Sequence, residues 1–154
     1  MSSGIAEQTT RPGKIGQSVG ALAAGFLVNI VLSLGTDFGL HAIGIWPVLA
    51  QPMTDSLLLV ATVYRTLYGV ISSYILARLA PNRPLGHALI GGAIGLALGI
   101  AGAAATWTRG LGPHWYSVAL LVLAVPTAWV GGKLRMLQLR RENGQFPEQS
   151  SQGH

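Results

Sequence analysis

Residues 56–77 read Ser-Leu-Leu-Leu-Val-Ala-Thr-Val-Tyr-Arg-Thr-Leu-Tyr-Gly-Val-Ile-Ser-Ser-Tyr-Ile-Leu-Ala, an apolar run with Arg65 near its middle. Three further runs of similar length and apolarity occur. We therefore predict four transmembrane helices, because about 20 apolar residues cross the hydrocarbon core of a bilayer. A guanidinium at the bilayer centre costs at least ~2.5–3.5 kcal/mol, so it normally faces protein, water or an opposite charge. Arg65 is therefore the best pointer to a site.

The composition of the 154-residue chain fits this prediction. Half of the residues are apolar, 10% are charged and the mean hydropathy is +0.48, whereas soluble domains carry about 25% charged residues. The expected fold is an all-α membrane protein, an up-down antiparallel bundle of four transmembrane helices over residues 14–136. The expected helices are residues 15–36 (or to 43), 55–79, 85–107 and 115–134. The last helix can continue to 142 as an amphipathic stub. Polar tails are expected at 1–13 and 137–154.

The net charge of +5 is explained by membrane topology rather than by nucleic-acid binding. Arg109 is the one basic residue expected in an outer loop, and Arg65 lies inside a helix. Because cytoplasmic loops are rich in Lys and Arg, we expect both termini in the cytoplasm of a bacterium, with the chain multi-pass in the inner (plasma) membrane and the lipid bilayer as its partner. The remaining eight basic residues fall on the cytoplasmic side in this topology: Arg11, Lys14, Arg78, Arg83, Lys133, Arg135, Arg140 and Arg141.

The sequence contains no motif that names a reaction. The absence of cysteine excludes thiol redox chemistry, disulfides and thiolate-ligated metals. The glycines near residues 91–99 lie inside an apolar run rather than after a strand, so they form no dinucleotide-binding fingerprint. We therefore expect no cofactor and no metal, and the sequence favours a protein that is not an enzyme.

Small residues recur at every fourth position of the third run: Gly91, Gly95, Gly99 and Ala103. They share one face of a helix, and such faces let two backbones pack closely in lipid. We expect this face to pack against a neighbouring helix of the same chain. A homo-oligomer interface and a glycine-lined path for substrate are the alternatives.

Polar residues around Arg65 form the candidate ligand site. If the first helix extends to residue 43, Asp37 reaches the depth of Arg65, and an ion pair would offset part of the burial cost of both charges. The alternatives are Arg65 in a hydrated cavity, where it would bind an anion or an anionic headgroup, and an unpaired Asp37 at the water interface. His41 follows Asp37 by one helical turn, and Tyr64 and Tyr68 share a face beside Arg65.

Four segments resemble those of small, uncharacterised bacterial inner-membrane proteins with four helices. The similarity covers about residues 20–136 and implies the same helical membrane fold, but it supplies no functional residues. The segments are Gly35-Thr-Asp-Phe-Gly-Leu-His41, Tyr64-Arg-Thr-Leu-Tyr-Gly69, Ala77-Arg-Leu-Ala-Pro81 and Gly112-Pro-His-Trp-Tyr116.

Three functional hypotheses follow. The first is a non-enzymatic small bundle that acts as a homo-oligomer or as an accessory subunit of a larger membrane protein, because such helices enclose little concave volume in one protomer. The second is a small transporter or channel with Asp37, His41 and Arg65 in a polar path. The third is a membrane enzyme or lipid-headgroup-binding protein that uses Arg65, Tyr64 and Tyr68. Transport requires polar groups that continue toward the cytoplasmic side, where the sequence offers few: Ser72, Ser73 and His87.

Overall fold

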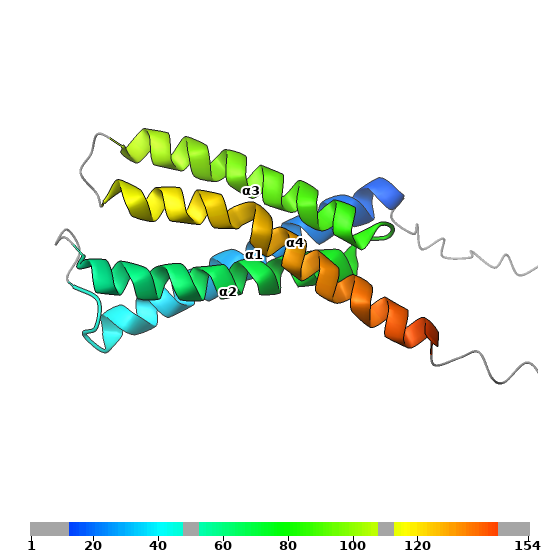
Figure 1. Ribbon diagram of the computed structural model, residues 1–154, viewed down its shortest axis with the longest axis horizontal. Coiled ribbons are helices and arrows are strands. Elements are labelled where there is room, and N and C mark those ends of the chain that lie inside the picture. Colours follow the sequence, from blue (N-terminus) through cyan, green and yellow to red (C-terminus); the bar gives the residue numbers. More distant parts are fainter. Residues whose placement is uncertain (1–12, 48–52, 108–112, 145–154) are drawn as a thin grey trace, which may run out of the picture.

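The described part of the computed structural model, residues 13–47, 53–107 and 113–144, is all-helical. Each of its four helices is long and apolar enough to cross a membrane. Successive helices run in opposite directions, so that the start of the first and the end of the last lie at the same end of the bundle (Figure 1). The helices are α1 (Lys14–Ala42), α2 (Asp55–Leu79), α3 (Pro84–Thr106) and α4 (His114–Gly144).

The first helix takes the longer of its two expected courses, and α1 therefore includes both Asp37 and His41. The helix stops where Gly44 adopts a positive φ of 75°, a conformation that glycine reaches without steric penalty. The backbone N–H of Trp46 then bonds the carbonyl of Leu40 at 3.1 Å. This turn reverses the chain and carries the Trp46 side chain back onto the bundle.

The last helix takes the longer of its two expected courses, since α4 passes residue 134 and includes the amphipathic stub expected to reach 142. The described part of the expected polar tail, residues 137–144, is helical and belongs to α4. Leu, Gln, Arg and Glu dominate this segment, and all are good helix formers. Two contacts support it: the Tyr74 hydroxyl donates to Gln138 Oε1 at 2.6 Å, and Arg135 Nη1 lies 3.6 Å from Glu142 Oε1. The expected tail at 1–13 lies, apart from Gly13, outside the described residues.

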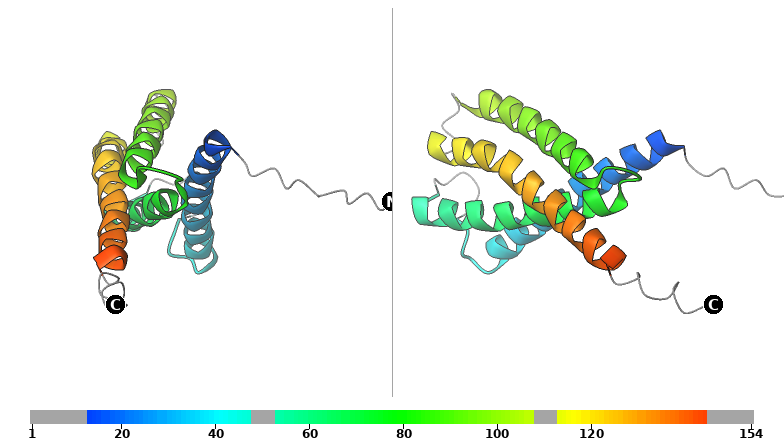
Figure 2. Two further views of the ribbon diagram at one scale, coloured as in Figure 1. Left: turned by 90° about the vertical axis from the view of Figure 1, so that its right-hand side faces the viewer. Right: turned by 45° about the vertical axis from the view of Figure 1, so that its right-hand side comes forward.

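The second helix is the centre of the bundle. It packs against the other three, whereas α4 packs on α2 and α3, and α1 packs mainly on α2. Figure 2 shows the consequence, with α1 standing apart from α3 and α4. The bundle thus consists of a tight unit, α2 to α4, with α1 laid across α2.

Glycines allow the tight unit to form. A Cβ on Gly131 would lie 2.6 Å from the Val70 carbonyl oxygen, and one on Gly92 would lie 2.5 Å from Ala128 Cβ. Real Cβ atoms do not approach that closely, so only glycine lets the backbone of α4 meet α2 and lets α3 meet α4.

The small-residue face expected on α3 faces three helices rather than one. A Cβ on Gly91 would lie 2.5 Å from Leu76 of α2, and one on Gly99 would lie 2.8 Å from a leucine of α4. Gly95 is more open, since the nearest atom to its built Cβ is a phenylalanine ring carbon of α1 at 3.9 Å. Ala103 continues the face one turn further along α3. Gly91 and Gly95 both border the inner cavity described below.

Candidate functional site

Arg65 and Asp37 form an ion pair that joins α2 to α1. Arg65 Nη2 donates to Asp37 Oδ2 at 2.7 Å, and the Tyr64 hydroxyl donates to the other carboxylate oxygen. The longer course of α1 is what brings Asp37 to this depth. The two side chains are still 35% and 26% exposed, respectively, so the pair borders space that water or a ligand can enter.

The two tyrosines expected at the site lie beside this pair. The Tyr64 and Tyr68 rings stack at tilted geometry with their centroids 5.5 Å apart. The Tyr68 hydroxyl shares a 2.8 Å hydrogen bond with the hydroxyl of Thr36, the residue before Asp37. The Arg65 guanidinium carbon lies 6.0 Å from the Tyr64 ring centre, at the outer limit of a cation–π contact. Both tyrosines therefore tie α2 to the same turn of α1.

A space that we call the outer chamber lies on one side of the ion pair. Its volume is about 250 Å³. His41, the remaining residue of the expected site, borders it, and the His41 and Trp46 ring centroids lie 6.4 Å apart. Trp46 is only 6% exposed. The lining residues are Asp37, His41, Trp46, Met53, Leu58, Arg65 and Tyr116.

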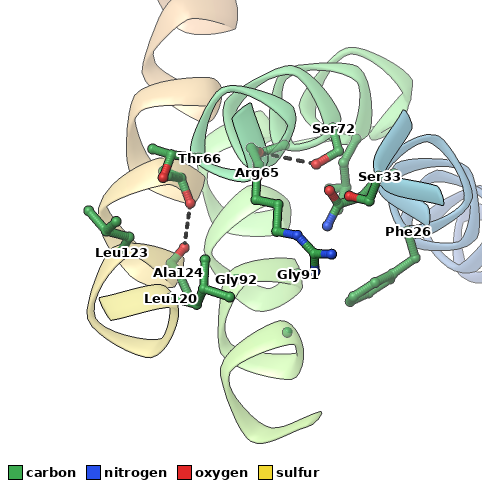
Figure 3. A pocket seen from close by; sticks show the side chains of 17 residues that line it. Phe26, Ser33, Arg65, Thr66, Ser72, Gly91, Gly92, Leu120, Leu123 and Ala124 are labelled. Carbon is green, nitrogen blue, oxygen red and sulfur yellow. Dashed lines mark hydrogen bonds between the residues drawn. The ribbon is translucent and has the colours of Figure 1, made fainter. Parts of the chain in front are cut away.

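A second space, the inner cavity, lies on the other side of Arg65. It has a volume of about 230 Å³ and receives residues from all four helices. Figure 3 shows the Arg65 guanidinium pointing into this space. Because Gly95 carries no side chain and its built Cβ has no atom nearer than 3.9 Å, α3 leaves part of this space unfilled. Among the described residues, Arg65 alone lines both spaces. The polar side chains of the inner cavity are Asn29, Ser33, Thr66, Ser72, Ser73 and Thr127.

The inner cavity offers both donors and acceptors of hydrogen bonds. Three hydroxyls donate to carbonyls of their own helix, which leaves their oxygen lone pairs as acceptors; two of these bonds are dashed in Figure 3. They are Thr66 to Thr62 O (2.6 Å), Ser72 to Gly69 O (3.1 Å) and Thr127 to Ala124 O (2.9 Å). Within the described residues, Asn29, Ser33 and Ser73 have no hydrogen-bond partner and can donate to a solute.

Leu76 marks the other end of the inner cavity. It lies between two glycines, since a Cβ on Gly25 of α1 or Gly91 of α3 would lie 2.9 Å or 2.5 Å from it. Arg65 and Leu76 are about 16 Å apart along α2, from the rise per residue of a helix. Past Leu76, Ser18 Oγ and His87 Nε2 lie 2.9 Å apart in the first turns of α1 and α3. Leu76 thus lies between the inner cavity and the Ser18–His87 end of the bundle, with Leu22 also close to Gly91.

The arrangement does not favour a metal site. His41 borders the same chamber as Asp37, but no group of three His, Cys, Asp or Glu side chains suited to a metal occurs among the described residues. His114 is engaged elsewhere, 3.2 Å from the carbonyl oxygen of Trp107. The residues present suit recognition of a polar solute by hydrogen bonds.

Sequence reasoning missed part of this site, although one signal was available. Asn29, Ser33, Asp37 and His41 recur at every fourth position of α1 and so form one polar stripe, which borders the inner cavity at its first half and the outer chamber at its second. Trp46 carried no such signal, because only the turn at the end of α1 brings its side chain to the chamber.

No protein-family model, curated protein or solved structure matches this chain. Function therefore has to be argued from the chemistry of the two spaces, since a fold of this class serves many activities.

Proposed function

We propose that this protein is a small transporter or channel of the bacterial inner membrane that passes a polar solute along the axis of its helix bundle. The observation that carries the proposal is the outer chamber and the inner cavity on either side of Arg65. Polar side chains line both spaces, and a further polar pair, Ser18 and His87, follows past Leu76. Polar groups inside apolar helices are expensive and commonly mark a path for solute or ions.

The orientation of the path follows from charge. With the basic segments in the cytoplasm, both termini and the Ser18–His87 end of the bundle lie inside the cell. The outer chamber then opens toward the periplasm. The four helices span the membrane, and the lipid faces are the exposed apolar faces that each helix carries.

Two barriers divide this path. The Arg65–Asp37 ion pair lies between the outer chamber and the inner cavity, and Leu76 lies between the inner cavity and the cytoplasmic end. A solute with a hydrogen-bonding or charged group can bind Arg65 and thereby lower the free energy needed to separate the Arg65–Asp37 ion pair. Displacement of Leu76 from between its two glycines then releases the solute on the other side.

The volume of the inner cavity favours this function over a purely structural bundle. The expectation of an oligomer or an accessory subunit rested on the idea that one protomer encloses little space. A cavity of about 230 Å³ holds several water molecules, since each takes about 30 Å³ in the liquid. Partnership with a second copy or a larger membrane protein remains a separate prediction.

The test uses the absence of cysteine, which makes any introduced thiol unique in the chain. Thr66→Cys and Asn29→Cys place a thiol in the inner cavity. Leu67→Cys and Ile30→Cys are matched controls, because each neighbours a test position at the same depth but lies on an exposed apolar face, where Leu67 is 57% exposed. A charged, membrane-impermeant thiosulfonate reacts with thiolate, which forms only where water is present.

The proposal predicts labelling of the two cavity thiols and not of the two controls. Reagent added to whole cells and to inverted vesicles then reports which barrier opens toward each side. Equal and negligible labelling at all four positions would mean a dry cavity, and the transport proposal would be wrong.

A further inference from the structure

Two residues that line the outer chamber each carry a buried N–H group without a hydrogen-bond partner. These groups are Trp46 Nε1 and Arg65 Nε, and they are the two buried side-chain polar atoms of the described residues that lack a partner. Both residues line the same space of about 250 Å³. Buried polar groups are almost always paired, and an exception calls for a missing water, ion or ligand. That both exceptions are donors of residues that line one chamber indicates a ligand that accepts hydrogen bonds.

The remaining groups of the chamber do not supply that acceptor. The Asp37 carboxylate already accepts bonds from the Tyr64 hydroxyl and from Arg65 Nη2. Met53 and Leu58 are apolar and contribute a wall. His41 and Tyr116 also border the chamber, and each side chain can both donate and accept, but neither pairs with Trp46 Nε1 or Arg65 Nε. Two donors of the chamber residues, Trp46 Nε1 and Arg65 Nε, therefore remain unpaired.

The geometry of arginine narrows the ligand class. Arg65 uses one nitrogen, Nη2, for Asp37, which leaves the rest of its planar fork for a second partner. Carboxylate and phosphate groups match such a fork with two parallel bonds. We propose that the outer chamber is a binding site for a small oxyanion, a carboxylate or phosphate group, held by the Trp46 indole N–H and the Arg65 guanidinium.

Two structural consequences follow. Trp46 Nε1 and Arg65 Nε expose almost no surface, so side chains of the chamber have to move slightly for an oxyanion to reach both. The Asp37 carboxylate competes for Arg65 and repels an incoming anion. Binding is therefore an exchange of partners at Arg65, and it does not depend on whether the inner cavity is hydrated.

The experiment follows the four indole N–H signals of the ¹⁵N-labelled full chain by NMR in maltoside micelles. Trp46→Phe identifies the Trp46 signal. Inorganic phosphate or acetate is titrated at constant ionic strength with chloride, and a second series adds phosphatidylglycerol in place of the soluble anion. The Trp46 signal should move downfield and saturate. The Trp129 signal is the control for non-specific anion effects, because its ring lies 4.3 Å from the Lys133 ammonium yet lies outside the chamber.

Two variants test the exchange at Arg65. Arg65→Gln should weaken binding roughly 10- to 100-fold, the range for a lost hydrogen bond to a charged group. Asp37→Asn should tighten it about tenfold, because a like charge nearby is removed. The unchanged positions of the other three indole signals check the fold of each variant. If the ion pair is only structural, Asp37→Asn should not increase the affinity for the anion. This variant therefore tests the proposed anion site even where Arg65→Gln fails to fold.

The outcomes separate the sources of the ligand. Saturation with soluble anions assigns the site to a free solute, and saturation with phosphatidylglycerol alone assigns it to a lipid headgroup. The proposal is overturned by a Trp46 signal that no probe moves, by equal movement at Trp129, or by an affinity that Asp37→Asn leaves unchanged. Thiol labelling in the inner cavity reports on the proposed path independently of these results.

Discussion

The ion pair between Asp37 and Arg65 gives the most direct prediction about stability. A double-mutant cycle compares Asp37→Asn, Arg65→Gln and the double variant with the natural chain. Breaking a fully buried pair by removing one partner costs about 3–5 kcal/mol, whereas an exposed pair contributes about 0–1 kcal/mol. The side chains are 35% and 26% exposed and their nitrogen and oxygen are 2.7 Å apart, which places the pair between these limits.

The expected magnitudes follow from what each variant leaves behind. Arg65→Gln leaves the carboxylate with the Tyr64 hydroxyl as its partner, so we expect a loss of about 2 kcal/mol rather than the full cost of an orphaned charge. Asp37→Asn leaves an uncompensated guanidinium between apolar helices, with a loss of similar size. The double variant removes both problems, and we expect a coupling free energy of about 1–2 kcal/mol.

The assay is reversible unfolding by SDS titrated into mild-detergent micelles, followed by circular dichroism. The chain supplies its own control pair, Arg135 and Glu142, whose atoms are 3.6 Å apart and whose glutamate is 60% exposed. A cycle with Arg135→Gln and Glu142→Gln should give a coupling below about 0.5 kcal/mol. If the Asp37–Arg65 coupling is no larger than that of the control pair, the account of the ion pair as a link between α1 and α2 is refuted.

Three further predictions concern packing, hydrogen bonding and the inner barrier. Gly131→Ala should destabilise the bundle by about 1–3 kcal/mol, because the new Cβ would meet a carbonyl of α2 at 2.6 Å. Gly102→Ala is the control and should not destabilise the bundle, because a Cβ there has nothing within 4 Å. Equal effects of the two variants in the SDS titration would contradict the packing argument. Tyr64→Phe should lower the free energy of unfolding by about 1.5–3 kcal/mol and Tyr68→Phe by about 0.5–1.5 kcal/mol. The first hydroxyl donates to a carboxylate, whereas the second pairs with a neutral hydroxyl. The reverse order in the same titration would show that the carboxylate charge does not strengthen the Tyr64 hydrogen bond. Leu76→Ala should raise labelling of a thiol in the inner cavity in inverted vesicles several-fold, and an unchanged rate there would show that this side chain is no barrier.

Much of the fold follows from local chemistry. Four apolar runs of sufficient length, separated by Pro, Gly and polar residues, specify four helices, because the backbone has to satisfy its hydrogen bonds within each run. The bounds of α2 agree with the expected 55–79, and those of α3 agree to within one residue. The end of α4 was expected at residue 134 or, as an amphipathic stub, at 142, and the helix takes the longer course because helix-forming residues continue after the hydrophobicity falls.

The candidate site was predictable only in part. Arg65 and Asp37 were identifiable because charges in apolar runs are costly and tend to find each other. The hydroxyls of the inner cavity were harder to identify as site residues from the sequence, because a Ser or Thr in a helix can hydrogen-bond to a backbone carbonyl of the same helix. Thr127 does so and gives no outward sign in the sequence that it borders a cavity.

The sequence by itself determined the four helices, each long and apolar enough to span a membrane, and the charge that needs a partner, because hydropathy, helix length and the cost of a buried charge act locally. Only the tertiary structure decided where the helices leave space. A glycine of α3 can either pack tightly against a neighbouring helix or leave space beside it. Gly92 packs tightly, whereas Gly95 leaves space. The position of Trp46 likewise depends on a left-handed turn and on α1 crossing α2. Packing between distant residues sets such features, and no local pattern encodes them.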